Sequence, residues 1–261
     1  MHGKCSLIGR MPGDWWRQFA GLRTLAFYQM THPGAKLNFM GNEIGQFIEW
    51  RYYESIQWFL TEEYETHRHH QAFIKALNHL YTAEPALYER GYTDDGFTWI
   101  DADNSKQSIV SFVRQGEDID DDLVILINFD PASYESFRVG VPREGDWEVI
   151  FDSDRPEFGG SGYAGVEPYT CSSEPYPWNG QMDSIEIKVP GLAGVVLKRR
   201  GPSSYKPPVV EEPKAAPKKR MSSVKPKAAA AKKAPAKAKA AKPAAKASTK
   251  SATAKKATAK K

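Results

Sequence analysis

Two carboxylates, two amides and an indole are concentrated between positions 42 and 50 of this sequence. Glu43 and Glu49 have the side chains that acid–base or nucleophilic catalysis uses in pairs, provided that a rigid scaffold sets their separation. The amides of Asn42 and Gln46 can hydrogen-bond polar ligands, and the Trp50 ring can pack on an apolar ligand face. The same side chains can instead hold a loop in shape through backbone hydrogen bonds, so binding and structural support both remain open.

The other reactive side chains do not suggest a metal or redox site. His67, His69 and His70 crowd the start of a predicted helix, with carboxylates nearby only as scattered surface charge, so we interpret them as a solvated helix end. Cys5 and Cys171 lie far apart without CxxC spacing, which favours two free thiols over a disulfide or a zinc site. We therefore expect no metal and no cofactor.

Two amphipathic helices are predicted in the first 85 residues. After Pro12-Gly13-Asp14, apolar side chains recur at helical spacing from Trp15 to Ala26, and this helix should end at residues 31–34. The second helix is predicted over residues 66–81. Between them, the apolar run from Leu37 to Met40 is too short for a buried helix and favours a buried strand. A helix followed by a buried strand is half of a β/α repeat.

Short strand-like runs separated by turn residues replace the helical pattern after residue 86. This arrangement predicts an antiparallel β-sandwich, with residues 155–180 as a long loop. The predicted strands are residues 97–100, 108–114, 123–128, 136–141, 147–151, 184–189 and 195–199. Five aromatic residues on or beside these runs are interpreted as sandwich core: Trp99, Phe112, Phe129, Phe137 and Trp147.

The formal net charge of +4 conceals two regions of opposite charge. Residues 206–261 contain 17 Lys and one Arg against two Glu, so they carry +16, and the preceding residues carry −12. Large apolar residues nearly vanish there, and such a composition cannot offset chain entropy. We predict a disordered tail over residues 202–261 that resembles the tails of linker histones. Its charge favours non-specific binding to nucleic acid or to another anionic surface.

Membrane and secretory signals are missing from the sequence. No run reaches the roughly 18 apolar residues that cross a bilayer, and the N-terminus lacks a basic segment followed by an apolar one. We expect a cytoplasmic protein without a membrane partner.

Three blocks within residues 2–60 carry a specific family resemblance. They are His2-Gly3-Lys4 leading to Met11-Pro12-Gly13-Asp14, then Phe39-Met40-Gly41-Asn42-Glu43, then Gln46 with Glu49-Trp50 and Ser55-Ile56-Gln57-Trp58. In this order and spacing they closely resemble bacterial glycogen branching enzymes of the α-amylase superfamily. Residues 95–199 are similar to the C-terminal β domain of that family, so only the tail lies outside the resemblance.

The resemblance implies a retaining glucan-processing enzyme, in which a β/α barrel holds a nucleophilic Asp, a general-acid Glu and a second Asp. The last catalytic Asp of the family sits in a Ser-His-Asp-Glu motif just before the His-Gly-Lys that is residues 2–4 here. All three catalytic carboxylates would then precede Met1, and we assign no catalytic residue. Residues 1–85 would be the C-terminal remnant of the barrel, and residues 86–201 the all-β C-terminal domain.

The resemblance also gives residues 42–50 a role, as the loop after the last barrel strand, where barrels present side chains to substrate. Asn42, Glu43, Gln46 and Glu49 would bind hydroxyls of an α-glucan, such as glycogen or an amylose-like chain, and Trp50 would stack on a sugar face. A catalytic role for the Glu43 and Glu49 pair is then not expected.

The leading hypothesis is the C-terminal portion of a 1,4-α-glucan branching enzyme, which forms α-1,6 branches in glycogen by chain transfer and is inactive as this portion alone. The alternative is a non-catalytic glucan-binding or scaffold protein with a nucleic-acid-binding tail.

Overall fold

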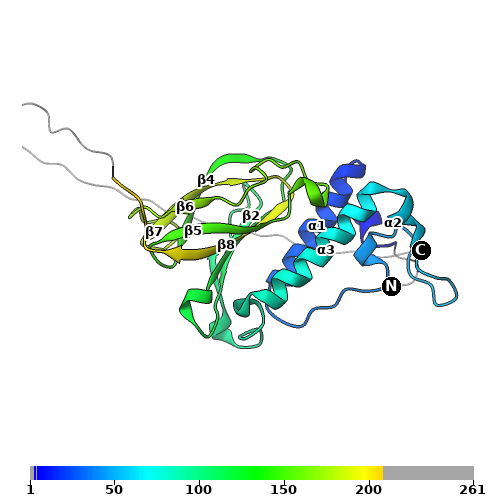
Figure 1. Ribbon diagram of the computed structural model, residues 1–261, viewed down its shortest axis with the longest axis horizontal. Helices are drawn as coiled ribbons and strands as arrows, with labels where there is room; N and C mark the ends of the chain where they lie inside the picture. Colours follow the sequence, from blue (N-terminus) through cyan, green and yellow to red (C-terminus); the bar gives the residue numbers. More distant parts are fainter. Residues whose placement is uncertain (1–2, 4, 208–261) are drawn as a thin grey trace, which may run out of the picture. The chain divides into compact units, whose positions relative to one another are not determined.

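The computed structural model describes residue 3 and residues 5–207 of the chain, so most of the predicted tail lies outside the described residues. Two long helices, α1 (Trp15–Thr31) and α3 (Glu65–Ala83), pack side by side and confirm the two predicted helices (Figure 1). The short helix α2 (Phe59–Glu63) precedes α3. Asp14 begins α1 because its carboxylate accepts a hydrogen bond from the main-chain N–H of Arg17 at 2.9 Å.

Two antiparallel sheets follow the helices. In the described part of the chain, one sheet has six strands in the order β1-β2-β3-β8-β5-β6, and the other pairs β4 with β7. All seven predicted strands are confirmed, whereas the three-residue β6 was missed inside the predicted loop. The strands are β1 (Phe97–Asp101), β2 (Ile109–Arg114), β3 (Leu123–Asn128), β4 (Tyr134–Val141), β5 (Asp146–Asp152), β6 (Thr170–Ser172), β7 (Asp183–Val189) and β8 (Ala193–Gly201).

The six-stranded sheet is covered on both faces. Val124 and Leu126 of β3 face the core shared with β4 and β7, whereas Ile125 and Ile127 face the core shared with α1 and α3. This alternation follows from the two-residue period of a strand. Burial on both sides explains why β3 is an uninterrupted apolar run. The predicted sandwich is therefore confirmed, with a layer of helices added on its other side (Figure 1).

The expected buried strand at residues 37–40 is wrong. Leu37, Phe39 and Met40 are 73%, 49% and 51% exposed, and no strand among the described residues pairs with this run. A strand needs a neighbour to satisfy its backbone N–H and C=O groups, and the local apolar pattern cannot show whether one is present. The segment instead has no regular secondary structure and leads into a turn at Met40.

The core interpretation of the five aromatic residues is partly wrong. Phe112 and Trp147 are fully buried, and Phe137 packs against the core between the sheets. Trp99 and Phe129, however, remain 43% and 42% exposed. Trp99 lies on β1 at the edge of the six-stranded sheet, and Phe129 follows the end of β3, so neither is enclosed by both sheets.

Hydrogen bonds to the sheet continue past β8. The main-chain N–H of Ser204 donates to Asp146 at 2.9 Å, and the Ser203 hydroxyl donates to the Ser173 carbonyl. The first residues of the predicted tail therefore contact β5 and the end of β6.

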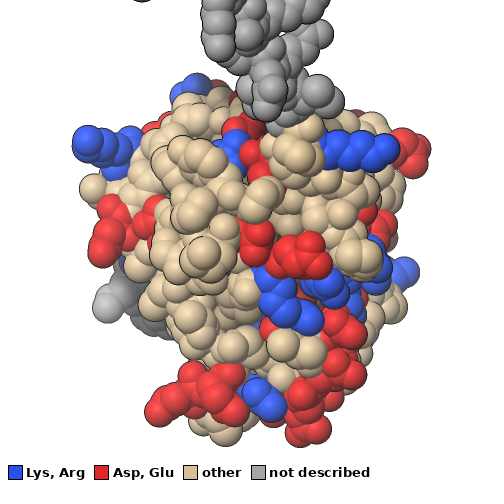
Figure 2. All heavy atoms as spheres, turned by 90° about the vertical axis from the view of Figure 1, so that its left-hand side faces the viewer, with Lys and Arg blue, Asp and Glu red and all other residues tan. Residues whose placement is uncertain are grey.

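On the face drawn in Figure 2, basic and acidic side chains are interspersed. None of the helices formed by the described residues has the length and apolar character to cross a membrane.

Candidate functional site

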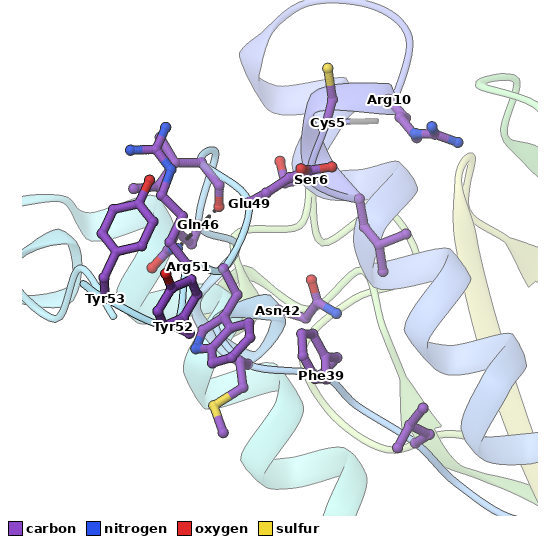
Figure 3. Close-up of a pocket in the computed structure, with 15 residues that line it drawn as sticks. Cys5, Ser6, Arg10, Phe39, Asn42, Gln46, Glu49, Arg51, Tyr52 and Tyr53 are labelled. Carbon is purple, nitrogen blue, oxygen red and sulfur yellow. Dashed lines mark hydrogen bonds between the residues drawn. The ribbon is translucent and has the colours of Figure 1, made fainter. Parts of the chain in front are cut away.

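The long loop between α1 and α2 and the N-terminal residues enclose a cavity of about 490 Å³ (Figure 3). Four of the five predicted site residues line it: Asn42, Gln46, Glu49 and Trp50. Glu43 lies in the same 3-10 turn, η2 (Asn42–Ile44), but does not line this cavity. The rest of the lining comes from Cys5, Ser6, Leu7, Arg10, Leu37, Phe39, Met40, Ile48, Arg51, Tyr52 and Tyr53.

Gln46 is used by the loop itself. Its side-chain Nε2 donates to the Ile48 carbonyl at 3.0 Å, and its Oε1 accepts from the main-chain N–H of Gln57 at 2.9 Å. The side chain is only 4% exposed, so it joins two stretches of the loop that are eleven residues apart. Of the two interpretations from the sequence, the geometry of Gln46 matches structural support.

Glu49 also has a structural contact. Its Oε2 accepts a hydrogen bond from the main-chain N–H of Gly3 at 2.7 Å, which ties the loop to the N-terminal segment. Trp50 is 39% exposed, and its ring lies edge-on to Phe39 with the centroids 5.5 Å apart. The indole therefore has a fixed neighbour and still presents part of its surface to the cavity.

Two glycines shape the turn that carries Asn42. Gly41 and Gly45 flank η2 with φ angles of +86° and +66°, a region that favours glycine. A Cβ at Gly45 would lie 3.0 Å from a ring carbon of Phe19, so α1 approaches this turn closely. The turn is therefore held against α1 as well as α3.

Two histidines hold the other side of this turn, and the interpretation as a solvated helix end is wrong for both. His67 and His70 are each 1% exposed. His67 Nδ1 lies 2.6 Å from the Ile44 carbonyl oxygen, and His70 Nε2 lies 3.0 Å from that of Asn42. Both carbonyls precede α3 by more than twenty residues, so helical periodicity could not reveal the partners. Only His69 is partly exposed, beside Glu65.

These contacts predict a pH-dependent stability. Burial is the main cause that lowers the pKa of His70 to about 3, with a further contribution from Arg23 and His67. Nδ1 of His70 has no hydrogen-bond partner among the described residues, so an added proton would be unsatisfied. In the unfolded chain this imidazole titrates near 6.5, so the unfolded state binds more protons below that pH and stability falls as the pH is lowered.

His70→Gln retains an N–H donor for the Asn42 carbonyl but does not titrate. We expect the variant to lose less stability than the unaltered protein between pH 6 and pH 4, by up to about 1.4 kcal/mol per pH unit. Urea unfolding at several pH values in this range measures the difference. Parallel pH dependences of the two proteins would contradict the assignment.

The aromatic wall of the cavity was largely missed in the sequence. Tyr52 and Tyr53 are 85% and 64% exposed, and their rings meet edge to face with centroids 5.2 Å apart. Figure 3 shows both beside the cavity with Arg51. The available signal was that Arg51-Tyr52-Tyr53 directly follows Trp50. Together with Trp50 and Phe39, these rings give the cavity surfaces on which an apolar ligand face can pack.

Three of the described residues that line the cavity are charged, namely Arg10, Glu49 and Arg51. Within the described part of the chain, Glu49 alone among these lining residues carries a carboxylate. Retaining glycoside chemistry needs two carboxyl groups about 5 Å apart, one as nucleophile and one as acid. The cavity therefore offers aromatic surfaces and hydrogen-bonding groups, with one carboxylate among its described lining residues.

The chain is 46% identical over 198 residues to the 1,4-alpha-glucan branching enzyme GlgB of Francisella tularensis subsp. novicida, a match that covers 76% of this chain and 31% of the relative. The branching enzyme of Clostridium perfringens is also 46% identical, over 200 residues that cover 76% of this chain and 30% of the relative. The chain thus spans less than a third of the length of these relatives.

Among solved structures, a debranching enzyme from Nostoc punctiforme aligns with a TM-score of 0.47 and 17% identity, over 76% of this chain and 34% of that one. Residues 99–200 match the family model described as the alpha amylase C-terminal all-beta domain. The β-sandwich is therefore similar to the alpha amylase C-terminal all-beta domain, in a chain whose 198 matched residues are similar to 1,4-α-glucan branching enzymes.

Proposed function

We propose that this chain is the C-terminal portion of a 1,4-α-glucan branching enzyme. The intact protein would cleave an α-1,4 glucan and transfer the segment to a 6-hydroxyl, which forms the α-1,6 branches of glycogen. The observation that carries the proposal is the 46% identity over 198 residues to enzymes of that name. The lone carboxylate of the cavity supports the part of the proposal that places catalysis elsewhere in the intact protein.

In this proposal, residues 1–85 are the last elements of the catalytic barrel, and residues 86–201 are the C-terminal domain. The exposure of Leu37, Phe39 and Met40 supports the assignment of the first part. Exposed apolar side chains of this kind suit a surface that another part of the intact protein covers.

The residues that line the cavity would then form one wall of the glucan-binding groove. Trp50 would stack on a sugar ring, and Asn42 and Glu49 would hydrogen-bond hydroxyl groups, whereas Gln46 would fix the loop that carries them. Glu43, which does not line the cavity, would reach glucan only if the missing part of the barrel extends the groove along η2.

The nucleotide sequence upstream of the Met1 codon tests the proposal. We expect an open reading frame there that continues into Ser-His-Asp-Glu-Val, the family motif with the last catalytic aspartate. A stop codon and a genuine start site directly before Met1 would overturn it. That result would favour the alternative, a non-catalytic glucan-binding or scaffold protein.

A second function is favoured by the +16 charge of residues 206–261, of which all but the first two lie outside the described residues. We propose that this segment binds nucleic acid without sequence preference. The full chain should bind duplex DNA at low salt, with a log–log slope of about −0.9Z for Z phosphates contacted. A chain that ends at Tyr205 should lose this binding in a salt titration by fluorescence anisotropy. Full DNA affinity in the shortened chain would show that the tail is not the binding element.

A further inference from the structure

We propose a second α-glucan site on the connection between β6 and β7, built on the rings of Tyr176 and Trp178. The identity of the ligand rests on the proposed function, whereas the site itself rests on the geometry of this connection. Tyr176 is 51% exposed and Trp178 is 43% exposed. Their ring centroids are 6.3 Å apart, and their planes differ by 36°. An α-1,4-glucan is a curved chain, so two tilted neighbouring rings can each meet one of its glucose units.

The backbone that carries the two rings is stiff. Pro175 and Pro177 flank Tyr176 and fix their own φ angles. Trp178 and Gln181 exchange main-chain hydrogen bonds of 3.1 and 2.9 Å across a tight turn. The two residues of that turn, Asn179-Gly180, have φ angles of +48° and +77°, which suits the turn that joins twisted antiparallel chains.

The turn is also fastened to the sheets. Oδ1 of Asn179 accepts from the main-chain N–H of Gly140 on β4 at 3.2 Å, and its Nδ2 donates to Asp101 on β1 at 3.1 Å. A Cβ at Gly140 would lie 2.3 Å from the Trp178 carbonyl oxygen, so the turn rests directly on β4. The rings are therefore positioned before a ligand arrives, and ordering costs little on binding.

Charged groups beside the rings suit a polyhydroxylated ligand. The Arg138 guanidinium lies over one face of the Tyr176 ring, 4.7 Å from the centroid, so the opposite face is the one offered to a sugar. Arg138 also forms an ion pair of 3.1 Å with Glu174 and another with Glu186. The C–H faces of a glucose unit can pack on the rings, and its hydroxyls can hydrogen-bond these charged groups at the edge. A protein partner would instead favour a larger continuous apolar patch.

The proposed site is separate from the cavity of Figure 3. The rings lie beside β4 and β7, which pack on one face of the six-stranded sheet, whereas α1 and α3 cover the other face (Figure 1). A glucan polymer held here would remain tethered to the protein while another part of it enters the cavity. Such a second contact raises the effective concentration of the polymer at the first.

Native electrophoresis of the full chain in gels that contain dissolved amylopectin tests the site, with dextran gels as the control for linkage type. We expect amylopectin, but not dextran, to retard the unaltered chain. The double variant Tyr176→Ala/Trp178→Ala should raise the apparent dissociation constant about tenfold or more, because it removes both stacking surfaces. Trp178→Phe should retain most of the affinity. Tyr92→Ala is the matched control, since Tyr92 is 81% exposed and precedes β1, outside the connection between β6 and β7.

Several results would overturn the second site. They are unchanged retardation of the double variant, an equal loss in Tyr92→Ala, and no retardation of the unaltered chain. If Trp50→Ala loses its retardation by amylopectin and the double variant does not, all of the binding lies at the cavity. The second site would then fail, and the proposed function would stand. The reading frame upstream of Met1 tests the proposed function independently of these gels.

Discussion

Incubated alone with amylose, the chain is expected to form no α-1,6 linkages above a heat-inactivated control. The retaining route needs a nucleophilic carboxylate and an acid partner held about 5 Å apart by a rigid scaffold. The cavity lining supplies one carboxylate, Glu49, and that carboxylate accepts a hydrogen bond from Gly3. Loss of a complete catalytic set removes about six orders of magnitude in rate or more, because residues that act as a unit do not replace one another.

Proton NMR of the product, or chain-length analysis after isoamylase debranching, measures the new linkages. Branch formation by the purified chain would show that the active site has been misplaced. Glu49→Gln and Glu43→Gln would then show which carboxylate is catalytic. If the unaltered chain forms no branches, neither variant should differ from it in this branching assay.

Arg114→Leu is expected to destabilise the fold by about 3 kcal/mol or more. Arg114 is fully buried at the end of β2, and its guanidinium donates to the carbonyl oxygens of Thr31, Leu87 and Gly96 at 2.8, 3.2 and 3.2 Å. One side chain thus joins the end of α1 to two turns that precede β1. Each buried carbonyl left without its donor costs about 1–3 kcal/mol.

The charge of Arg114 persists at neutral pH, because burial lowers its pKa only to about 10. Arg114→Lys keeps a charge but loses the planar fork that reaches three acceptors, so it should also be destabilising. Arg200→Leu is the matched control. That arginine is half exposed and pairs with Glu148, so its loss should cost about 1 kcal/mol or less. Similar urea midpoints for Arg114→Leu and Arg200→Leu would contradict the role given to Arg114.

The secondary structure could be predicted from the sequence in those segments where apolar residues recur with the period of a helix or form a short strand-like run. Helices α1 and α3 have one apolar face, and the seven longer strands carry apolar or aromatic runs between turn residues. Strand β6 was not predicted, because three residues are too few to establish a period. Residues 37–40 show the opposite failure, because an apolar run indicates that a chain can be buried but not which neighbour buries it.

The positions that line the cavity could be proposed from the family motifs but not from periodicity, and their role in binding stays a prediction. Those motifs led to Asn42, Gln46, Glu49 and Trp50, which all line one cavity, and to Glu43, which does not. The roles of the buried imidazoles at His67 and His70 could not be predicted, because their partners are main-chain carbonyls. The type of a residue gives no information about carbonyls that a distant loop brings to it.

The proposed function is tested most directly by a chimera in which the corresponding C-terminal residues of the Francisella tularensis subsp. novicida branching enzyme are replaced by the 198 matched residues of this chain. We expect the chimera to form α-1,6 branches from amylose, because the catalytic carboxylates come from the relative and this chain supplies the closing elements and the β domain. The unaltered relative and its form truncated before these residues are the positive and negative controls. A chimera that folds with a cooperative thermal transition but forms no more branches than the truncated relative would overturn the proposed function.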